Sequence, residues 1–209
     1  MRKISWDKYF SVFLITFLIF VIGILLSQTI SSKSSKEILK TQKQVKNYIL
    51  SLNLQSDIAS EYICRVNVFD LTKEKLNLGQ QIEILEKNLG KENEIVRDLK
   101  QDYSLLSIRQ WLLVKQVREK CNRNINIILF FYSNTNNSSE SESQGYVLDY
   151  LYEKEPEDIV IYAFDMDEDN PALDTIKSIY GIEVAPSVVV NERLFSGFQS
   201  KGRIEMLLT

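Results

Sequence analysis

A long apolar segment lies near the start of the chain, at residues 10–26. It contains no charged residue, and as a helix rising about 1.5 Å per residue it would extend over roughly 26 Å. With Tyr9 before it and residues 27–30 after it, the segment approaches the roughly 30 Å of a bilayer core. We therefore predict an uncleaved transmembrane anchor within residues 1–31. A cleaved signal peptide is the alternative, although such peptides need a shorter apolar run.

Basic residues flank this segment on both sides, so its orientation is only weakly determined. The flanking residues are Arg2, Lys3 and Lys8 before it and Lys33, Lys36 and Lys40 after it. Counting the amino terminus, the positive-inside rule slightly favours a cytoplasmic N-terminus. That orientation predicts a single-pass membrane protein whose C-terminal domain is extracytoplasmic.

Apolar side chains then recur at helical spacing, and residues 33–121 contain no proline. In the second half of this region the apolar positions alternate three and four apart, which is the heptad pattern of a coiled coil. The pattern breaks near Gly90 and Asn93, residues that can end one helix and cap the next. The sequence predicts a helical, coiled-coil hairpin in residues 32–122. One continuous coiled coil is the alternative.

The only two cysteines lie at positions that fit this hairpin. Cys64 and Cys121 are almost equally distant from the predicted turn, so two antiparallel helices would bring them together. A disulfide requires Cα atoms within about 7 Å, which the base of a hairpin can supply. We predict a Cys64–Cys121 disulfide, worth about 4 kcal/mol in the chain-entropy model. Such a bond persists outside the reducing cytosol and would support the extracytoplasmic orientation; two unrelated free cysteines are the alternative.

Strand-like and helix-like segments alternate through residues 123–209. Strands are predicted at residues 125–132, 158–165, 184–190 and 193–198, and helices at residues 144–154, 172–180 and 200–208. The order strand–helix–strand–helix–strand–strand–helix predicts a compact α/β sandwich with parallel and then antiparallel strand pairing.

Three segments of this region resemble thioredoxins. They are FDMDEDNPAL at 164–173, IKSIYGIEVAPSVVVN at 176–191 and FSGFQSKGRIEMLL at 195–208. The region as a whole therefore looks like a thioredoxin fold, and the anchor with its hairpin resembles, more vaguely, membrane-bound thioredoxin-like proteins of microbes. The resemblance implies a cis peptide bond before Pro186. It also implies that the backbone of Ala185 faces an extended peptide.

The Cys-x-x-Cys pair of thioredoxins is missing from this sequence. In that family the pair follows the first strand, where this chain has a polar loop without cysteine. Counting forward from the strand places Asn136 and Ser139 at the two sulfur positions, whereas counting back from the helix places Ser138 and Ser141 there. A hydroxyl cannot replace the attacking thiolate. The resemblance therefore implies a redox-inactive domain that binds peptide by strand addition. The predicted peptide-binding residues are Ala185, Pro186, Asn136, Asn137, Ser138, Ser139 and Ser141.

Composition removes several classes of function. The chain has no histidine, which excludes histidine-dependent zinc sites and catalytic triads. The formal charge of −3 conceals an asymmetry, because residues 123–209 hold 6 basic and 15 acidic side chains, a balance of −9. This excess of negative charge argues against a nucleic-acid partner.

We predict no cofactor and no metal. Asp165, Asp167 and Asp169 alternate as in a calcium loop, but such a loop needs glycine at its sixth position, where this chain has Asn170. We therefore interpret the three aspartates as a solvated strand end rather than a calcium site. Two overlapping glycosylation sequons begin at Asn136 and Asn137, although chance in an Asn- and Ser-rich loop also accounts for them.

Together these features predict a membrane-anchored, redox-inactive thioredoxin-like domain that acts as a protein- or peptide-binding or assembly module. Its partners would be the membrane, an unidentified protein or peptide, and a second copy bound through the helical hairpin. Two alternatives remain. One is a thiol–disulfide oxidoreductase that uses Cys64 and Cys121 or cysteines of a partner. The other is a structural coiled-coil scaffold capped by the α/β region.

Overall fold

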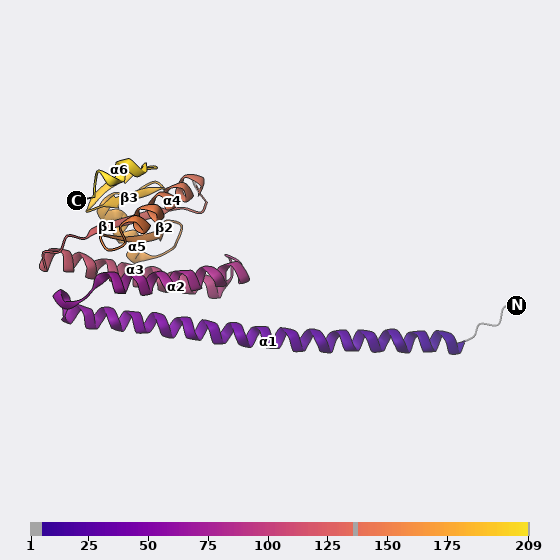
Figure 1. Ribbon diagram of the computed structural model, residues 1–209. Coiled ribbons are helices and arrows are strands. Elements are labelled where there is room, and N and C mark those ends of the chain that lie inside the picture. The colour runs from indigo at the N-terminus through magenta and orange to yellow at the C-terminus, as the bar shows by residue number, and fades with distance from the viewer. Residues whose placement is uncertain (1–5, 136–137, 209) are drawn as a thin grey trace. The chain divides into compact units, whose positions relative to one another are not determined.

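The computed structural model describes residues 6–135 and 138–208 and divides the chain into two compact units, Met1–Gln44 and Val45–Thr209 (Figure 1). The helical elements that come first are α1 (Trp6–Glu61), the short 3-10 helix η1 (Ile63–Arg65), α2 (Val68–Leu89) and α3 (Glu94–Lys120). The mixed region that follows contains β1 (Asn126–Tyr132), α4 (Ser138–Lys154), β2 (Ile159–Asp165), α5 (Pro171–Tyr180), β3 (Ser187–Val190), β4 (Arg193–Ser196) and α6 (Lys201–Glu205).

The first unit holds the apolar part of α1, where Phe10 and residues 12–22 have exposed side chains. In the part of the chain that the structure describes, no helix has the length and apolar content needed to cross a membrane. The prediction of a transmembrane anchor in residues 1–31 is thereby corrected. The predicted single-pass topology depended on that anchor and is corrected with it. The same holds for the predicted cytoplasmic N-terminus and extracytoplasmic C-terminal domain.

In the second unit, α2 and α3 form the predicted hairpin. Gly90 follows α2 with a φ of 91°, a conformation that glycine adopts at little cost, and its amide donates to the Glu86 carbonyl at 2.8 Å. The Asn93 side chain then accepts a hydrogen bond from the Ile95 amide at 3.0 Å and caps α3. The predicted reversal near residue 90 is confirmed, and the continuous coiled coil is excluded.

A second break, at residues 62–67, was not expected from the sequence. Here α1 ends and α2 begins at a cap in which the Asn67 side chain accepts from the Phe69 amide. The end of α1 thus packs on the hairpin as a third helix rather than continuing into it. The shared core consists of Val45, Ile49, Leu52, Leu78, Ile82, Leu99 and Leu106. The break lacks glycine and proline, and Asn67 is the only conventional signal within it.

The predicted disulfide between Cys64 and Cys121 is confirmed, with Cα atoms 5.4 Å apart. Cys64 lies in η1, directly before α2, and Cys121 is the C-cap of α3. Because these two helices have similar lengths, residues at their outer ends meet at the base of the hairpin. The prediction from the turn position was therefore right, although α1 is a separate helix.

The four strands form one sheet in the order β2-β1-β3-β4. Strand β1 pairs parallel with β2 and antiparallel with β3, and β3 pairs antiparallel with β4. The predicted element order and the predicted change from parallel to antiparallel pairing are both confirmed.

Helices cover both faces of this sheet. One face packs on α3 and α5, and the other packs on α4 and α6. Trp111 and Val114 of α3 are buried against the sheet, while Leu99 and Leu106 on another side of the same helix join the core with α1 and α2. Helix α3 therefore belongs to two cores, which joins the helical part of the second unit to the sheet.

Lys75 of α2 is buried at the contact between this helix and the sheet, with 1% of its surface exposed. Its ammonium nitrogen donates to the Ile161 carbonyl of edge strand β2 at 3.1 Å and lies 4.2 Å from the centre of the Tyr162 ring. The Tyr103 ring of α3 is 5.9 Å away. Burial penalises the charged form and lowers the pKa of Lys75 from 10.5 to about 7.

Candidate functional site

Four strand ends meet at one side of the sheet, which we call the carboxyl edge. Tyr132 and Asp165 are paired at the ends of β1 and β2, while Ser187 at the start of β3 pairs with Ser196 at the end of β4. Phe131 lies opposite Ser187, which brings the two pairs together. In open α/β sheets, ligands bind beyond the carboxyl ends of the parallel strands. The carboxyl edge is therefore the candidate site.

The predicted cis peptide bond between Ala185 and Pro186 is present at this edge. The Pro186 carbonyl accepts from the Gly197 amide at 2.8 Å. Both Ala185 and Pro186 are buried, so their side chains offer little surface to a ligand. The exposed apolar side chains nearby in the chain are Val184 and Phe198, which are 50% and 45% exposed. The sequence analysis did not predict these two residues as binding residues, although both lie within the thioredoxin-like segments.

The loop after β1 is folded around one carboxylate. Asp167 accepts hydrogen bonds from the Ser133 hydroxyl at 2.9 Å, the Asn134 amide at 3.0 Å and the Thr135 hydroxyl at 3.1 Å. Partial burial by itself would raise the pKa of Asp167, but these donors stabilise the carboxylate and bring the pKa below its ordinary value. Asp167 thus holds the polar loop in place from the end of the neighbouring strand.

We expect Asp167→Asn to lower the free energy of unfolding at pH 7 by about 1 kcal/mol, because an amide replaces a largely exposed carboxylate that accepts several hydrogen bonds. The lowered pKa means that this stabilisation is present above about pH 4 and disappears as pH falls through the pKa of the folded state. Urea unfolding at pH 7 and pH 3 measures both effects. The matched control is Asp169→Asn, which changes an exposed carboxylate of the same segment. Equal losses in the two variants would contradict this role for Asp167.

Asp165 and Asp167, two of the three alternating aspartates, serve as hydrogen-bond acceptors. Asp165 accepts from the Asn134 side chain at 2.6 Å and from the Asp167 amide at 3.0 Å. Across residues 6–135 and 138–208, no group of three or more His, Cys, Asp and Glu side chains is arranged to hold a metal ion. Their contacts with the polar loop give these carboxylates a structural role.

Three of the five predicted binding residues of the polar loop fall within the described part of the chain. Asn136 and Asn137, which also begin the two sequons, lie outside the described residues. Ser138 and Ser139 are exposed in the first turn of α4. Ser141 is buried, and its hydroxyl accepts from the Ser133 amide at 3.3 Å. Helix α4 begins six residues earlier than predicted because serine-rich first turns show little apolar periodicity.

A cleft of about 750 Å³ opens between the α2–α3 turn and the carboxyl ends of β1 and β2. Its acidic lining residues are Glu83, Glu86, Glu92, Asp98, Asp165, Asp167, Glu168 and Asp169, and its basic ones are Lys91, Arg97 and Lys100. This excess of carboxylates produces a negative potential that attracts cationic groups. The −9 charge of residues 123–209 was the sequence signal for it, but the helical wall of the cleft depends on packing.

The disulfide lies at the opposite end of the sheet from this site. Cys121 precedes β1, whereas the polar loop follows it, and a strand of seven residues extends about 23 Å. Since Cys64 and Cys121 are the only cysteines of the chain and are bonded to each other, the carboxyl edge has no thiol.

No protein-family model and no curated protein matches the chain. Among solved structures, one described as that of a malarial protein is similar at 17% identity and a TM-score of 0.33, over 40% of this chain and 93% of that chain. Chloroplastic thioredoxin z is similar at 15% identity and a TM-score of 0.35, over 45% of this chain and 85% of that chain. A thioredoxin is thus among the structures that this chain resembles. At these TM-scores the likenesses carry no conclusion about function.

Proposed function

We propose that residues 123–209 form a redox-inactive thioredoxin-like domain that binds an extended protein segment at the carboxyl edge. The strand order and the cis bond before Pro186 support this fold assignment. The observation that carries the proposal is the position of the two cysteines. Both cysteines form one disulfide at the far end of the sheet. The carboxyl edge, where thioredoxins carry their two cysteines, has no cysteine in this chain.

Without a thiolate the edge can still recognise a peptide by contact. Disulfide exchange requires attack by a thiolate, which serine and asparagine cannot supply. Val184 and Phe198 provide exposed apolar surface, and the exposed hydroxyls of Ser138 and Ser139 can donate to peptide carbonyls. We propose that an extended segment with apolar and basic side chains binds here, the basic ones being attracted by the acidic charge of the domain.

We expect the full chain to show no thiol–disulfide exchange. In an insulin-reduction assay with dithiothreitol, the chain should not raise the rate above that of a protein-free control. The Cys64→Ser, Cys121→Ser double variant should behave identically. Faster reduction that is lost in the double variant would contradict the proposal and support an oxidoreductase that uses these two cysteines.

Peptide binding can be tested with a random decapeptide library displayed on phage. We expect enrichment on the full chain and at least a tenfold loss of affinity for the selected peptides in Phe198→Glu, because a carboxylate replaces an apolar contact. Ile179→Glu is the matched control, since Ile179 is 69% exposed near the end of α5, away from the carboxyl edge. Equal binding by both variants would place the peptide site elsewhere.

A further inference from the structure

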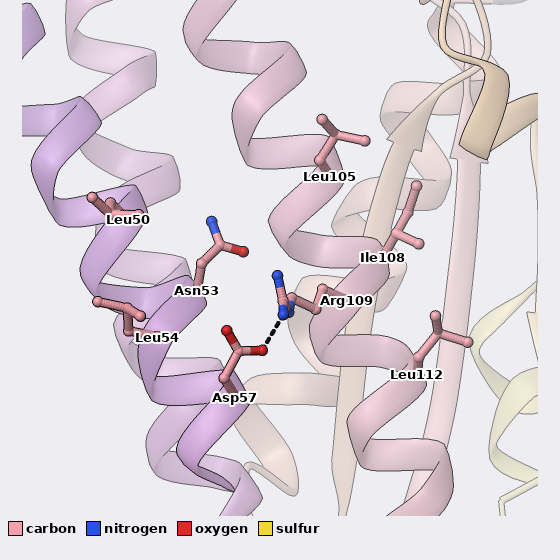
Figure 2. Close-up of a pocket in the computed structure, with 8 residues that line it drawn as sticks. All are labelled: Leu50, Asn53, Leu54, Asp57, Leu105, Ile108, Arg109 and Leu112. Atoms are coloured by element: carbon pink, nitrogen blue, oxygen red, sulfur yellow. Dashed lines mark hydrogen bonds and ion pairs between the residues drawn. The ribbon is translucent and has the colours of Figure 1, made fainter. Parts of the chain in front are cut away.

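An open apolar groove runs between α1 and α3 in the second unit of the chain. It has a volume of about 530 Å³ and is lined by Leu50, Asn53, Leu54, Asp57, Leu105, Ile108, Arg109 and Leu112 (Figure 2). Its four leucines are 46–59% exposed, which is unusual for side chains that lie together on neighbouring helices. An ion pair between Asp57 and Arg109 crosses the groove between the two helices.

The two walls have the same residue spacing. Leu50, Asn53, Leu54 and Asp57 on α1, and Leu105, Ile108, Arg109 and Leu112 on α3, each follow the spacing i, i+3, i+4, i+7. This spacing places four side chains on one helix face and is the pattern of a helix-bundle seam. Another apolar face of α1 is already used, because Val45, Ile49 and Leu52 pack on α2 and α3. The groove is therefore a second, unfilled seam.

The two helices are parallel along this seam. Lys46 of α1 lies 3.9 Å from both Asp98 and Asp102 of α3, and further along the same helices Asp57 meets Arg109. Two parallel helices with a common open seam make up half of a four-helix bundle. The missing half would be another pair of helices with matching apolar spacing.

We propose that a second copy of this chain covers the groove, with its own α1 and α3 packed antiparallel to those of the first copy. A twofold axis beside Asp57 and Arg109 would place each aspartate of one copy opposite the arginine of the other. The charged positions of the seam are thus complementary to themselves.

The exposed area is sufficient for such a dimer. Leu50, Leu54, Leu105 and Leu112 are joined by Ile58, which is 63% exposed on the adjoining face of α1. Five half-exposed aliphatic side chains offer on the order of 100 Å² each, or roughly 1,000 Å² from two copies. With a polar rim this reaches the lower end of specific interfaces, so we expect a dimer that dissociates in the micromolar range.

Sedimentation equilibrium of the full chain between about 1 and 100 µM tests the proposal. We expect the wild type to dimerise and Leu54→Glu to weaken dimerisation at least tenfold, because the seam would have to bury a carboxylate. Ile84→Glu is the matched control, since Ile84 is 59% exposed on α2 and lies outside the groove. An unchanged helical circular-dichroism spectrum in each variant would show that the helices remain folded. Association that persists in Leu54→Glu, for example through the exposed residues 12–22, would overturn the proposal.

Charge reversal supplies a second, independent readout. We expect Asp57→Arg alone and Arg109→Asp alone each to weaken dimerisation, because like charges would then face each other across the axis. The variant with both substitutions should regain it, since complementarity is restored. A wild-type chain that stays monomeric at 100 µM would overturn the proposal and leave an amphipathic helix of another protein as the occupant.

Discussion

Replacing Lys75 by methionine should make the protein more stable at pH 7 and remove most of the dependence of its stability on pH between 7 and 9. Because the folded-state pKa is lowered from 10.5 to about 7, the unfolded chain binds a proton more tightly than the folded one. This penalty is fully present below pH 7 and is relieved as pH rises towards 10.5, up to about 5 kcal/mol in total. Methionine removes the penalty but leaves the Ile161 carbonyl without its donor, so we expect a net gain of about 2 kcal/mol at pH 7.

The composition of this chain makes the measurement unusually clear. With no histidine and with both cysteines in a disulfide, Lys75 and the amino terminus are the groups expected to titrate between pH 7 and 9. Urea unfolding in this window should show wild-type stability rising with pH and a nearly flat profile for Lys75→Met. The control is Lys73→Met, which alters an exposed lysine two residues away and should keep the wild-type slope. A flat wild-type profile would mean that the buried amine does not have a lowered pKa.

Removal of the disulfide should lower the free energy of unfolding by about 4 kcal/mol, the second large effect that we expect. Cys64 and Cys121 are 57 positions apart, so their bond restricts a long loop in the unfolded chain. It also joins η1 to the end of α3, immediately before β1, where the helical hairpin meets the sheet. Loss of the bond should therefore destabilise the contact between α3 and the sheet together with the hairpin.

Comparison of oxidised wild type, reduced wild type and the Cys64→Ser, Cys121→Ser double variant provides the test. In urea unfolding, reduction should bring the wild type to the stability of the double variant, which should itself be insensitive to reductant. If all three proteins unfold at the same urea concentration, the loop is not constrained in the unfolded state as proposed. The disulfide prediction is independent of Lys75, which lies on α2 and does not contact either cysteine.

Local signals in the sequence were enough to predict most of the helices and strands. Gly90 and Asn93 marked the hairpin turn because glycine readily adopts positive φ and asparagine accepts the first free amides of a helix. The position of that turn then fixed the Cys64–Cys121 pair, and the alternation of strands and helices gave the topology of the sheet. The cis bond at Pro186 followed from the resemblance of its surroundings to thioredoxins.

The predictions that the structure corrected concern features that no single segment of the sequence can specify. The apolar segment near the N-terminus was interpreted from composition as a membrane anchor, and the structure does not support that interpretation. The break at residues 62–67 was missed because it contains neither glycine nor proline. There the chain turns because α1 can then bury Val45, Ile49 and Leu52 against both hairpin helices.

The sequence by itself determined most of the secondary structure, the disulfide partners and the lack of cysteine in the polar loop, because each depends on residue type and local spacing. The tertiary structure decided what the polar and apolar side chains do. Lys75 has a lowered pKa only because α2 buries it against β2, and Asp167 is a loop anchor only because β1 and β2 are paired. Leu54 and Leu112 share a groove only because α1 and α3 lie side by side. Burial, pKa and surface complementarity all arise from contacts between residues distant in the chain, and packing alone creates those contacts.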